Sequence, residues 1–378
     1  MTLRVGIMSA NWGAFAHLPA WRSIPGVEVV AICTSRRETA EAAAKRCGIE
    51  TPLWDAQAMG SHPEIDILDC GTRPSVRDPV VANALQHGKH VYNAIPFSTN
   101  IDSARTLRDA WRASGKVGVV DAFCEWLPAH RLMKEMLEQG FLGQPFGGTC
   151  QFQISLFNKP TTRFPYNWFW QSGLGVSALR NLGSHALHML VYLFGDIAEV
   201  VAHDGQLLKE WHFEDGSTIK AETNDFASLL LRFRAGLVIQ LQVSWSATVP
   251  PGWCLEAFGS KGRFAVTAPN FPTSRDSVLR AGTLESGRME KIAIPERLLS
   301  SADVGVDFAA DPAPVYPMAL SMSRMIQSIR GVGSARPDFE QAWTVECVLE
   351  AARRSAEERR WVRVDEVRSP QRSLTSPP

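Results

Sequence analysis

The chain has 378 residues and equal numbers of basic and acidic side chains, 39 of each. That length predicts two domains with a large core. The balanced charge gives no reason to expect nucleic acid or a membrane as a partner. We therefore expect the partner to be a small-molecule substrate. The seven cysteines are scattered, which predicts reduced thiols in a cytoplasmic protein rather than disulfides or a metal site. We expect neither a membrane span nor a signal peptide.

The opening stretch predicts a buried strand, a tight turn and a helix. Residues 3–8 form a short apolar run, and small residues follow it. In a dinucleotide-binding fold, such a turn and the helix after it hold the pyrophosphate. The glycine fingerprint of that fold is replaced here, at about Ser9, Asn11 and Ala14. The stretch is therefore either a divergent cofactor-binding turn or an ordinary strand–helix connection. The candidate cofactor contacts in it are Ser9, Ala10, Asn11, Trp12 and Gly13.

The end of the second strand, residues 27–33, bears on the choice of cofactor. In a dinucleotide fold an acid at this place accepts from the ribose 2′-hydroxyl of NAD, whereas an arginine pairs with the 2′-phosphate of NADP. The residues here are Thr34, Ser35, Arg36 and Arg37, with no acid among them. They predict that NADP is favoured, with NAD possible. Alternatively, the two arginines only begin the solvated helix expected over 38–46.

Strands and helices alternate through the rest of the first 122 residues. Strands are expected at 65–70, 90–92 and 117–120, with helices over 79–87 and 101–114. This alternation predicts a doubly wound parallel sheet. Ligands bind such sheets beyond the carboxyl ends of the strands. Further candidate cofactor contacts at those ends are Thr72, Arg73, Pro74, Asn93, Ile95 and Pro96.

From residue 147 the pattern changes to strand-like runs with few helices between them. The runs are 149–156, 227–233, 238–246 and 254–258, and a long helix is expected over 338–354. They predict an α+β domain with a large, mostly antiparallel open sheet. We therefore expect a dinucleotide-binding domain at 1–122, a substrate-binding and oligomerisation domain at 123–366, and a disordered tail at 367–378.

Short stretches spread over almost the whole chain resemble one family. They are 4–7 with 17–20, 65–67, 84–91, 137–143, 182–188, 259–262 and 351–362. In this order they resemble the glucose-fructose oxidoreductase, inositol dehydrogenase and rhizopine-catabolism superfamily (Gfo/Idh/MocA). The resemblance implies an N-terminal Rossmann domain against a C-terminal open sheet, with the substrate pocket between them. It also implies a homodimer or homotetramer assembled through that sheet.

The chain departs from the family pattern at two places. Where family members carry Glu-Lys-Pro, with a lysine implied to assist proton transfer, this chain has Ala94, Ile95 and Pro96. Isoleucine can neither donate nor accept a proton. Where the family favours Asp-x-x-x-His on a helix, this chain has Asn181 and His185.

His185 is the candidate acid or base that the substitutions leave. Asn181, His185 and His188 are spaced i, i+4 and i+7, so we expect them on one helix face. A histidine suits proton transfer near neutral pH. The alternative is that His185, and more so His188, is a buried structural histidine. A metal is not expected because the third ligand would be the poor donor Asn181.

A second candidate cluster precedes that helix. Lys159 or Arg163 would steer a polar or anionic substrate, Tyr166 would donate a proton, and Trp168 and Trp170 would form an apolar wall. This composition favours a ring-bearing substrate, sugar-like or aromatic. The same residues are also typical of a subunit interface.

Glu125 and Trp126 stand where the family often has a basic residue. The acid would orient the substrate or replace the missing base. Alternatively, it is a solvated acid at a helix start.

Together these features predict an NAD(P)-dependent oxidoreductase. It would transfer a hydride between the cofactor and a hydroxyl or carbonyl group of a ring-bearing small molecule, with His185 as acid or base. Two alternatives stay open. One is a nucleotide-sensing regulatory protein, since yeast galactose-pathway repressors share the family fold and lack the lysine. The other is a cofactor-assisted lyase or hydrolase.

Overall fold

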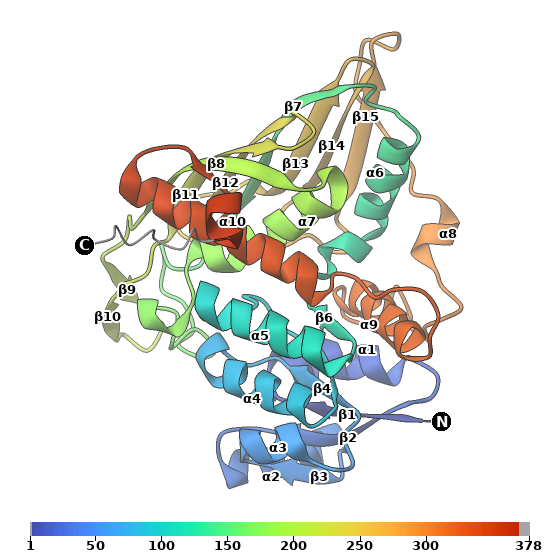
Figure 1. Ribbon diagram of the computed structural model, residues 1–378, viewed down its shortest axis with the longest axis vertical. Coiled ribbons are helices and arrows are strands. Elements are labelled where there is room, and N and C mark those ends of the chain that lie inside the picture. The colour runs from blue at the N-terminus through green and yellow to red at the C-terminus, as the bar shows by residue number, and fades with distance from the viewer. Residues whose placement is uncertain (1, 370–378) are drawn as a thin grey trace, which may run out of the picture.

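Alternating apolar strands and helices build a six-stranded parallel sheet from the first third of the chain. The structure is a computed structural model that describes residues 2–369. The strands run in the order β3-β2-β1-β4-β5-β6 (Figure 1). They are β1 (Leu3–Ile7), β2 (Val27–Cys33), β3 (Thr51–Leu53), β4 (Ile67–Cys70), β5 (His90–Asn93) and β6 (Gly118–Val120). The order reverses between β1 and β4, and ligands bind at such a switch point. The predicted doubly wound sheet is confirmed.

The helices of this domain begin and end at recognisable signals. They are α1 (Leu18–Arg22), α2 (Arg37–Cys47), α3 (Ala56–Ser61), α4 (Pro74–Gln86) and α5 (Ile101–Ser114). Asn100 caps α5 by accepting the N–H groups of Asp102 and Ser103. The helix predicted over 79–87 begins earlier, at Pro74, because proline suits the first helical position, where its missing N–H costs nothing. A π-helical turn, η1 (Gly13–His17), leads into α1.

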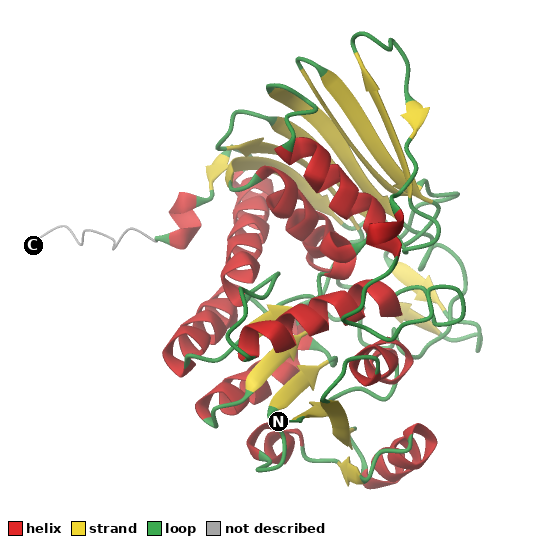
Figure 2. Ribbon diagram, turned by 90° about the vertical axis from the view of Figure 1, so that its right-hand side faces the viewer, coloured by secondary structure: helices red, strands yellow, loops and turns green. Residues whose placement is uncertain are grey.

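The second domain is a nine-stranded sheet with helices against one face (Figure 2). The order is β16-β15-β14-β13-β7-β12-β11-β8-β17, and all pairs are antiparallel except β7 with β12. Buried and exposed side chains alternate along β11, as expected of a sheet packed on one side. The strands are β7 (Pro145–Gln153), β8 (Ile197–Gly205), β11 (Phe226–Phe233), β12 (Val238–Ser244), β13 (Gly252–Gly259), β14 (Gly262–Ala268), β15 (Val278–Thr283), β16 (Glu290–Lys291) and β17 (Val362–Arg363), with a separate pair, β9 (Glu210–His212) and β10 (Thr218–Lys220).

Two C-terminal helices return to the first domain. They are α9 (Val315–Ile329) and α10 (Phe339–Glu358). Met318 and Met322 of α9 belong to the same buried cluster as Val5 and Ile7 of β1. In Figure 1, α10 crosses between the lower, N-terminal layer and the large sheet. The core of the first domain is therefore completed by residues far beyond position 122.

The remaining helices connect these layers. They are η2 (Phe123–Trp126), α6 (Pro128–Glu138), η3 (Ser172–Leu174), η4 (Leu179–Gly183), α7 (Ser184–Phe194), α8 (Glu296–Leu299) and α11 (Asp365–Arg368). The prediction that the tail is disordered from residue 367 is wrong for its first residues, because Val367 is buried in α11. Its last part, 370–378, lies outside the described residues. Within the described chain, no helix is both long and apolar enough to span a membrane.

Candidate functional site

One large cleft of about 1780 Å³ extends over the carboxyl ends of the parallel strands and on between the domains. We divide it into a nucleotide half, lined mainly by the loops after β1, β2 and β4, and a reaction half. The reaction half is lined by residues 94–95, 121, 123, 164–169 and 271, by η4 and by α7. Parallel strands bring their carboxyl ends to one edge. The topology therefore explains why residues far apart in sequence meet here.

Most of the predicted cofactor contacts line the nucleotide half. They are Ser9, Ala10, Asn11, Trp12, Thr34, Ser35, Arg36, Thr72, Arg73 and Pro74. Ile95 lines the reaction half. Gly13, Arg37, Asn93 and Pro96 do not line the cleft within the part of the chain that the structure describes.

The first turn is shaped from behind by Gly13. A Cβ there would lie 2.8 Å from Cγ2 of Ile7 and 2.9 Å from Cβ of Ser9. The Gly13 N–H donates to the Ser9 hydroxyl at 3.3 Å. The turn is also held from α2, since Arg46 donates to the Ala10 carbonyl at 2.9 Å. Glycine is thus required for close packing of the turn, and the residues before it face the cleft.

The two arginines after β2 have different surroundings. Arg37 pairs with Glu41 at 2.8 Å and stacks over the ring of Trp54. The Arg36 side chain lines the cleft and makes no hydrogen bond or ion pair to any other described residue. Thr34, beside it, bonds to the Thr39 hydroxyl at 2.6 Å. Of these two arginines, only Arg36 is therefore placed to meet an anionic group in the cleft.

The reaction half contains the predicted Asn181, His185, Tyr166 and Trp168. His185 is the second residue of α7, and its side chain is 8% exposed. Burial lowers the pKa of His185 to about 4, and the negative charge of Asp121 opposes that shift. Its ring meets Phe271 edge-on at 4.9 Å. The imidazole is therefore neutral at physiological pH and can accept a proton.

Asn181 lies in the π-helical turn η4, directly before α7. Its neighbour Arg180 donates to the carboxylate of Glu346 at 3.0 Å and to the Ser98 carbonyl at 2.6 Å. These bonds join η4 to α10 and to the first domain. They hold Asn181 and His185 over the ends of the parallel strands.

A buried ionic network beside the cleft was missed from sequence. His17 Nδ1 lies 2.9 Å from both carboxylate oxygens of Asp69, and its Nε2 lies 3.1 Å from Oδ2 of Asp121. Tyr92 donates to Oδ1 of Asp121 at 2.9 Å, and Trp21 donates to Oδ2 of Asp69 at 2.7 Å. Burial opposes the charge on His17, but Asp69 and Asp121 outweigh it and raise its pKa to about 10. The signal available in the sequence was an acid at the end of each of two parallel strands.

The structure places Glu125, Trp126 and His188 outside the cleft. Gln341 of α10 donates to the carboxylate of Glu125 and lies 3.2 Å from Nδ1 of His188. Burial raises the pKa of Glu125 to about 8, so this acid is not solvated. His188 is three residues beyond His185, which turns it about 60° around the helix, toward α10. Trp126 donates to the Arg336 carbonyl at 3.3 Å.

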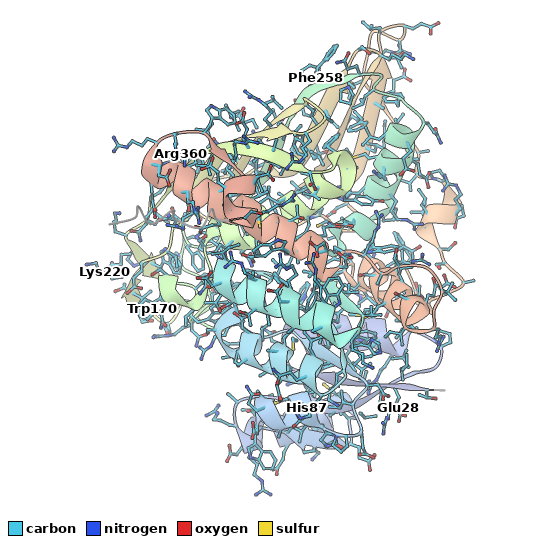
Figure 3. All side chains as sticks on the ribbon, in the orientation of Figure 1. Glu28, His87, Trp170, Lys220, Phe258 and Arg360 are labelled. Atoms are coloured by element: carbon cyan, nitrogen blue, oxygen red, sulfur yellow. The ribbon has the colours of Figure 1, made fainter. Side chains whose placement is uncertain are left out.

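Three residues of the second candidate cluster also lie outside the cleft. Lys159 is exposed, and Arg163 donates to the Ser217 hydroxyl at 3.0 Å. Trp170 donates to the Asn167 carbonyl at 3.2 Å and lies beside the β9–β10 pair, where Figure 3 labels it near Lys220.

Two predicted cofactor contacts lie behind the cleft wall. Asn93 donates to the Phe97 carbonyl at 2.9 Å, and Pro96 is buried.

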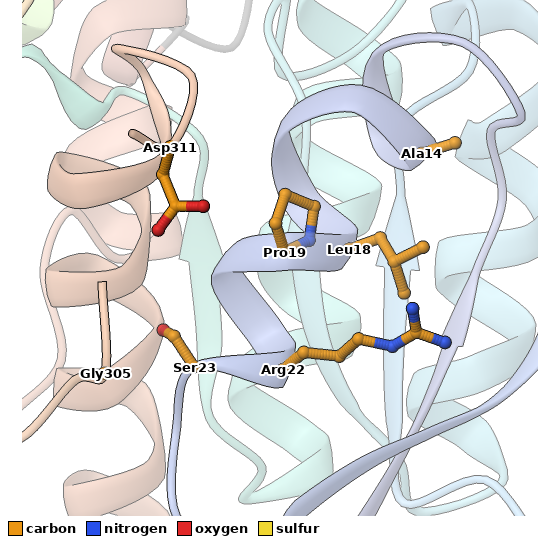
Figure 4. Close-up of a pocket in the computed structure, with 7 residues that line it drawn as sticks. All are labelled: Ala14, Leu18, Pro19, Arg22, Ser23, Gly305 and Asp311. Atoms are coloured by element: carbon orange, nitrogen blue, oxygen red, sulfur yellow. The ribbon is translucent and has the colours of Figure 1, made fainter. Parts of the chain in front are cut away.

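The cleft walls include aromatic residues that the sequence did not single out. They are Phe123, Phe164, Phe169 and Phe271. A smaller hollow of about 430 Å³ lies behind α1 (Figure 4), where Arg22 already donates to the Cys47 carbonyl at 2.6 Å. Among residues 2–369, no group of three or more His, Cys, Asp or Glu side chains is arranged to hold a metal.

Comparison with known proteins agrees with this architecture. Residues 3–122 match the model "Oxidoreductase family, NAD-binding Rossmann fold", and residues 130–265 match the GFO/IDH/MocA C-terminal domain. The chain belongs to the Gfo/Idh/MocA oxidoreductase family, as the sequence resemblance predicted.

Relatives of known name are distant. D-apiose dehydrogenase of Paraburkholderia graminis is 28% identical over 67% of this chain, a match that spans 64% of that relative, less than two thirds of its length. Myo-inositol 2-dehydrogenase of Thermotoga maritima is 24% identical over 69% of this chain and 74% of its own. A levoglucosan dehydrogenase solved with NADH and L-sorbose has a TM-score of 0.86 at 20% identity, covering 97% of this chain and 100% of that one. At that identity the likeness shows the fold alone.

The His17 network predicts how stability depends on pH. The pKa of His17 is raised from 6.5 to about 10 on folding, so the protonated network stabilises the fold fully below pH 6.5. That stabilisation is lost as pH rises toward 10. We expect the free energy of unfolding in urea to decline over this range.

A His17→Gln variant should be less stable by about 3–5 kcal/mol, because two buried carboxylates lose their cation. Its free energy of unfolding should also not decline between pH 6.5 and 10. A wild-type unfolding free energy that stays flat from pH 6.5 to 10 would contradict the ionic assignment.

Proposed function

We propose that this protein is an NAD(P)-dependent dehydrogenase that acts on a hydroxyl group of a ring-bearing, sugar-type small molecule. The observation that carries the proposal is the single cleft joining the β1–η1 turn to His185. The relatives named above are dehydrogenases of apiose, myo-inositol and levoglucosan. The aromatic walls of the reaction half suit the apolar face of a ring.

The residues of the nucleotide half fit a dinucleotide. The glycine-backed turn at residues 9–12 would hold the pyrophosphate. The loop after β2 would hold the adenosine ribose, which leaves the nicotinamide at Ile95 and Asp121. When bound, this cofactor supplies the hydride chemistry. The protein must then align the reacting carbon and handle one proton.

His185 is the proposed proton acceptor. Oxidation of an alcohol to a carbonyl removes a hydride from carbon, which a bound cofactor would accept, and a proton from the hydroxyl group, which needs a base in the protein. The neutral His185 ring lines the reaction half, while Ile95 has no proton chemistry. Asn181 and Tyr166 line the same half and supply polar contacts for substrate oxygens. Burial raises the pKa of Tyr166, which keeps its phenol a donor.

We propose that NADP is preferred over NAD, with Arg36 pairing with the 2′-phosphate. An Arg36→Ala variant should weaken NADP binding by about 1–3 kcal/mol, the strength of a charge-assisted hydrogen bond, and should change NAD binding far less. Calorimetric titration of both cofactors measures this. Arg37→Ala is the matched control, because Arg37 is bonded to Glu41 and should leave both affinities unchanged. Equal wild-type affinities for NAD and NADP would contradict the preference.

The role of His185 predicts a loss of turnover without a loss of cofactor. His185→Ala should lower kcat by about 10²–10⁴-fold, the usual contribution of a general acid or base. His185→Asn should do the same, since it keeps a polar group but cannot titrate near neutral pH. Steady-state kinetics on an oxidisable sugar or cyclitol, with cofactor binding measured separately, tests both.

The control for this series is His188→Asn, on the same helix but outside the cleft, compared at equal folded fraction by thermal melting. Its kcat should match the wild type. In the wild type, kcat for oxidation should fall only below about pH 4, as His185 becomes protonated. Near-full turnover in both His185 variants would make His185 a structural residue.

A further inference from the structure

The network beside the cleft carries an excess negative charge. Two carboxylates, Asp69 and Asp121, share the single imidazolium of His17, so the formal charge of the three groups is −1. The other donors, Tyr92 and Trp21, are neutral. Within residues 2–369, no Lys or Arg side chain forms an ion pair with either carboxylate. Among the described residues, no second cation is therefore paired with this charge.

The charge reaches the cleft through Asp121. This residue follows the carboxyl end of β6, is 4% exposed and lines the reaction half beside Ile95 and Phe123, both apolar. It is the only acidic side chain that lines the cleft in the described chain. Both of its oxygens accept hydrogen bonds from buried donors, His17 and Tyr92. The carboxylate is thus held in place at the wall of the reaction half.

We propose that Asp121 makes the cleft select the oxidised form of the nicotinamide cofactor over the reduced form. This inference rests on the proposed function, which places the nicotinamide ring at this end of the cleft. The oxidised ring is a pyridinium cation and the reduced ring is neutral. A fixed carboxylate attracts only the cation, and does so strongly where water is excluded.

The consequence is tighter binding of the oxidised cofactor together with a smaller driving force for reduction of the bound ring, because the attraction to the carboxylate is lost when the ring becomes neutral. The oxidised cofactor, which accepts the hydride, is bound more tightly, and the reduced product is held less tightly and leaves more readily. Asp121 is in this role a specificity-determining residue for the redox state. The proton still passes to His185, whose pKa is lowered by burial and raised in part by the same carboxylate.

The test is the ratio of the dissociation constants of the oxidised and reduced cofactors, measured by titration without substrate. In Asp121→Asn, the dissociation constant of the oxidised form should rise about tenfold, while that of the reduced form should change less than twofold. Arg36→Ala is the matched control, because the adenosine end is common to both forms. It should weaken both equally and leave the ratio as in the wild type.

A second pair of variants leaves the buried network intact, in case Asp121→Asn does not fold. Ile95→Lys places a cation in the cleft beside Asp121 and should shift the ratio in the same direction. Ile95→Met, of similar length and uncharged, should not. The inference would be overturned if folded Asp121→Asn and Ile95→Lys bound both cofactor forms with the same ratio of dissociation constants as the wild type. Failure of the wild type to bind either form would instead contradict the proposed function.

Discussion

The buried imidazolium of His17 is the interaction on which the site depends. It joins the π-helical turn after β1 to the carboxyl ends of β4 and β6, through Asp69 and Asp121. Burying three ionisable groups costs several kcal/mol per ion unless the charges are paired and hydrogen-bonded. Here each carboxylate accepts hydrogen bonds from His17 and from a neutral donor, Tyr92 of β5 or Trp21 of α1. The network therefore fixes the strand ends that form the floor of the cleft.

A second constraint ties the two domains together. Arg180 in η4 binds Glu346 of α10 and the Ser98 carbonyl of the first domain, and α9 completes the first domain's core. The pair is largely buried, so loss of either partner would leave an uncompensated charge. Because Arg180 precedes Asn181, the same contacts that join the domains also set the position of the residues facing the cleft.

The cleft is electrostatically divided. Its nucleotide half is lined by arginines, among them Arg36, Arg46 and Arg73, which suit phosphate groups. Its reaction half is aromatic, with a neutral histidine and one carboxylate. Where the family resemblance implies a lysine, the chain has Ile95. The described lining of the reaction half therefore contains no Lys or Arg, and its one acidic side chain, Asp121, is hydrogen-bonded to buried groups.

The sequence by itself determined the parallel sheet and the second, mostly antiparallel sheet, and it predicted most of the residues that line the nucleotide half. The reason is that strand periodicity and turn residues are local, and parallel topology then places every strand end at one edge. It also predicted Asn181 and His185 as site residues, through a family-like stretch, and the structure places both in the cleft. It also predicted His188 on the same helix face and Glu125 as a substrate contact. Packing against α10 instead places both residues outside the cleft.

Tertiary structure alone decided which charges meet. Asp69 and Asp121 lie 52 and 104 residues from His17 in the chain, and no local pattern pairs them. The same holds for Arg36 and Arg37, which are equivalent in sequence, whereas the fold gives Arg37 a partner in Glu41 and directs Arg36 to the cleft. Burial and long-range contact decide the partners of these groups, and neither can be read from neighbouring residues.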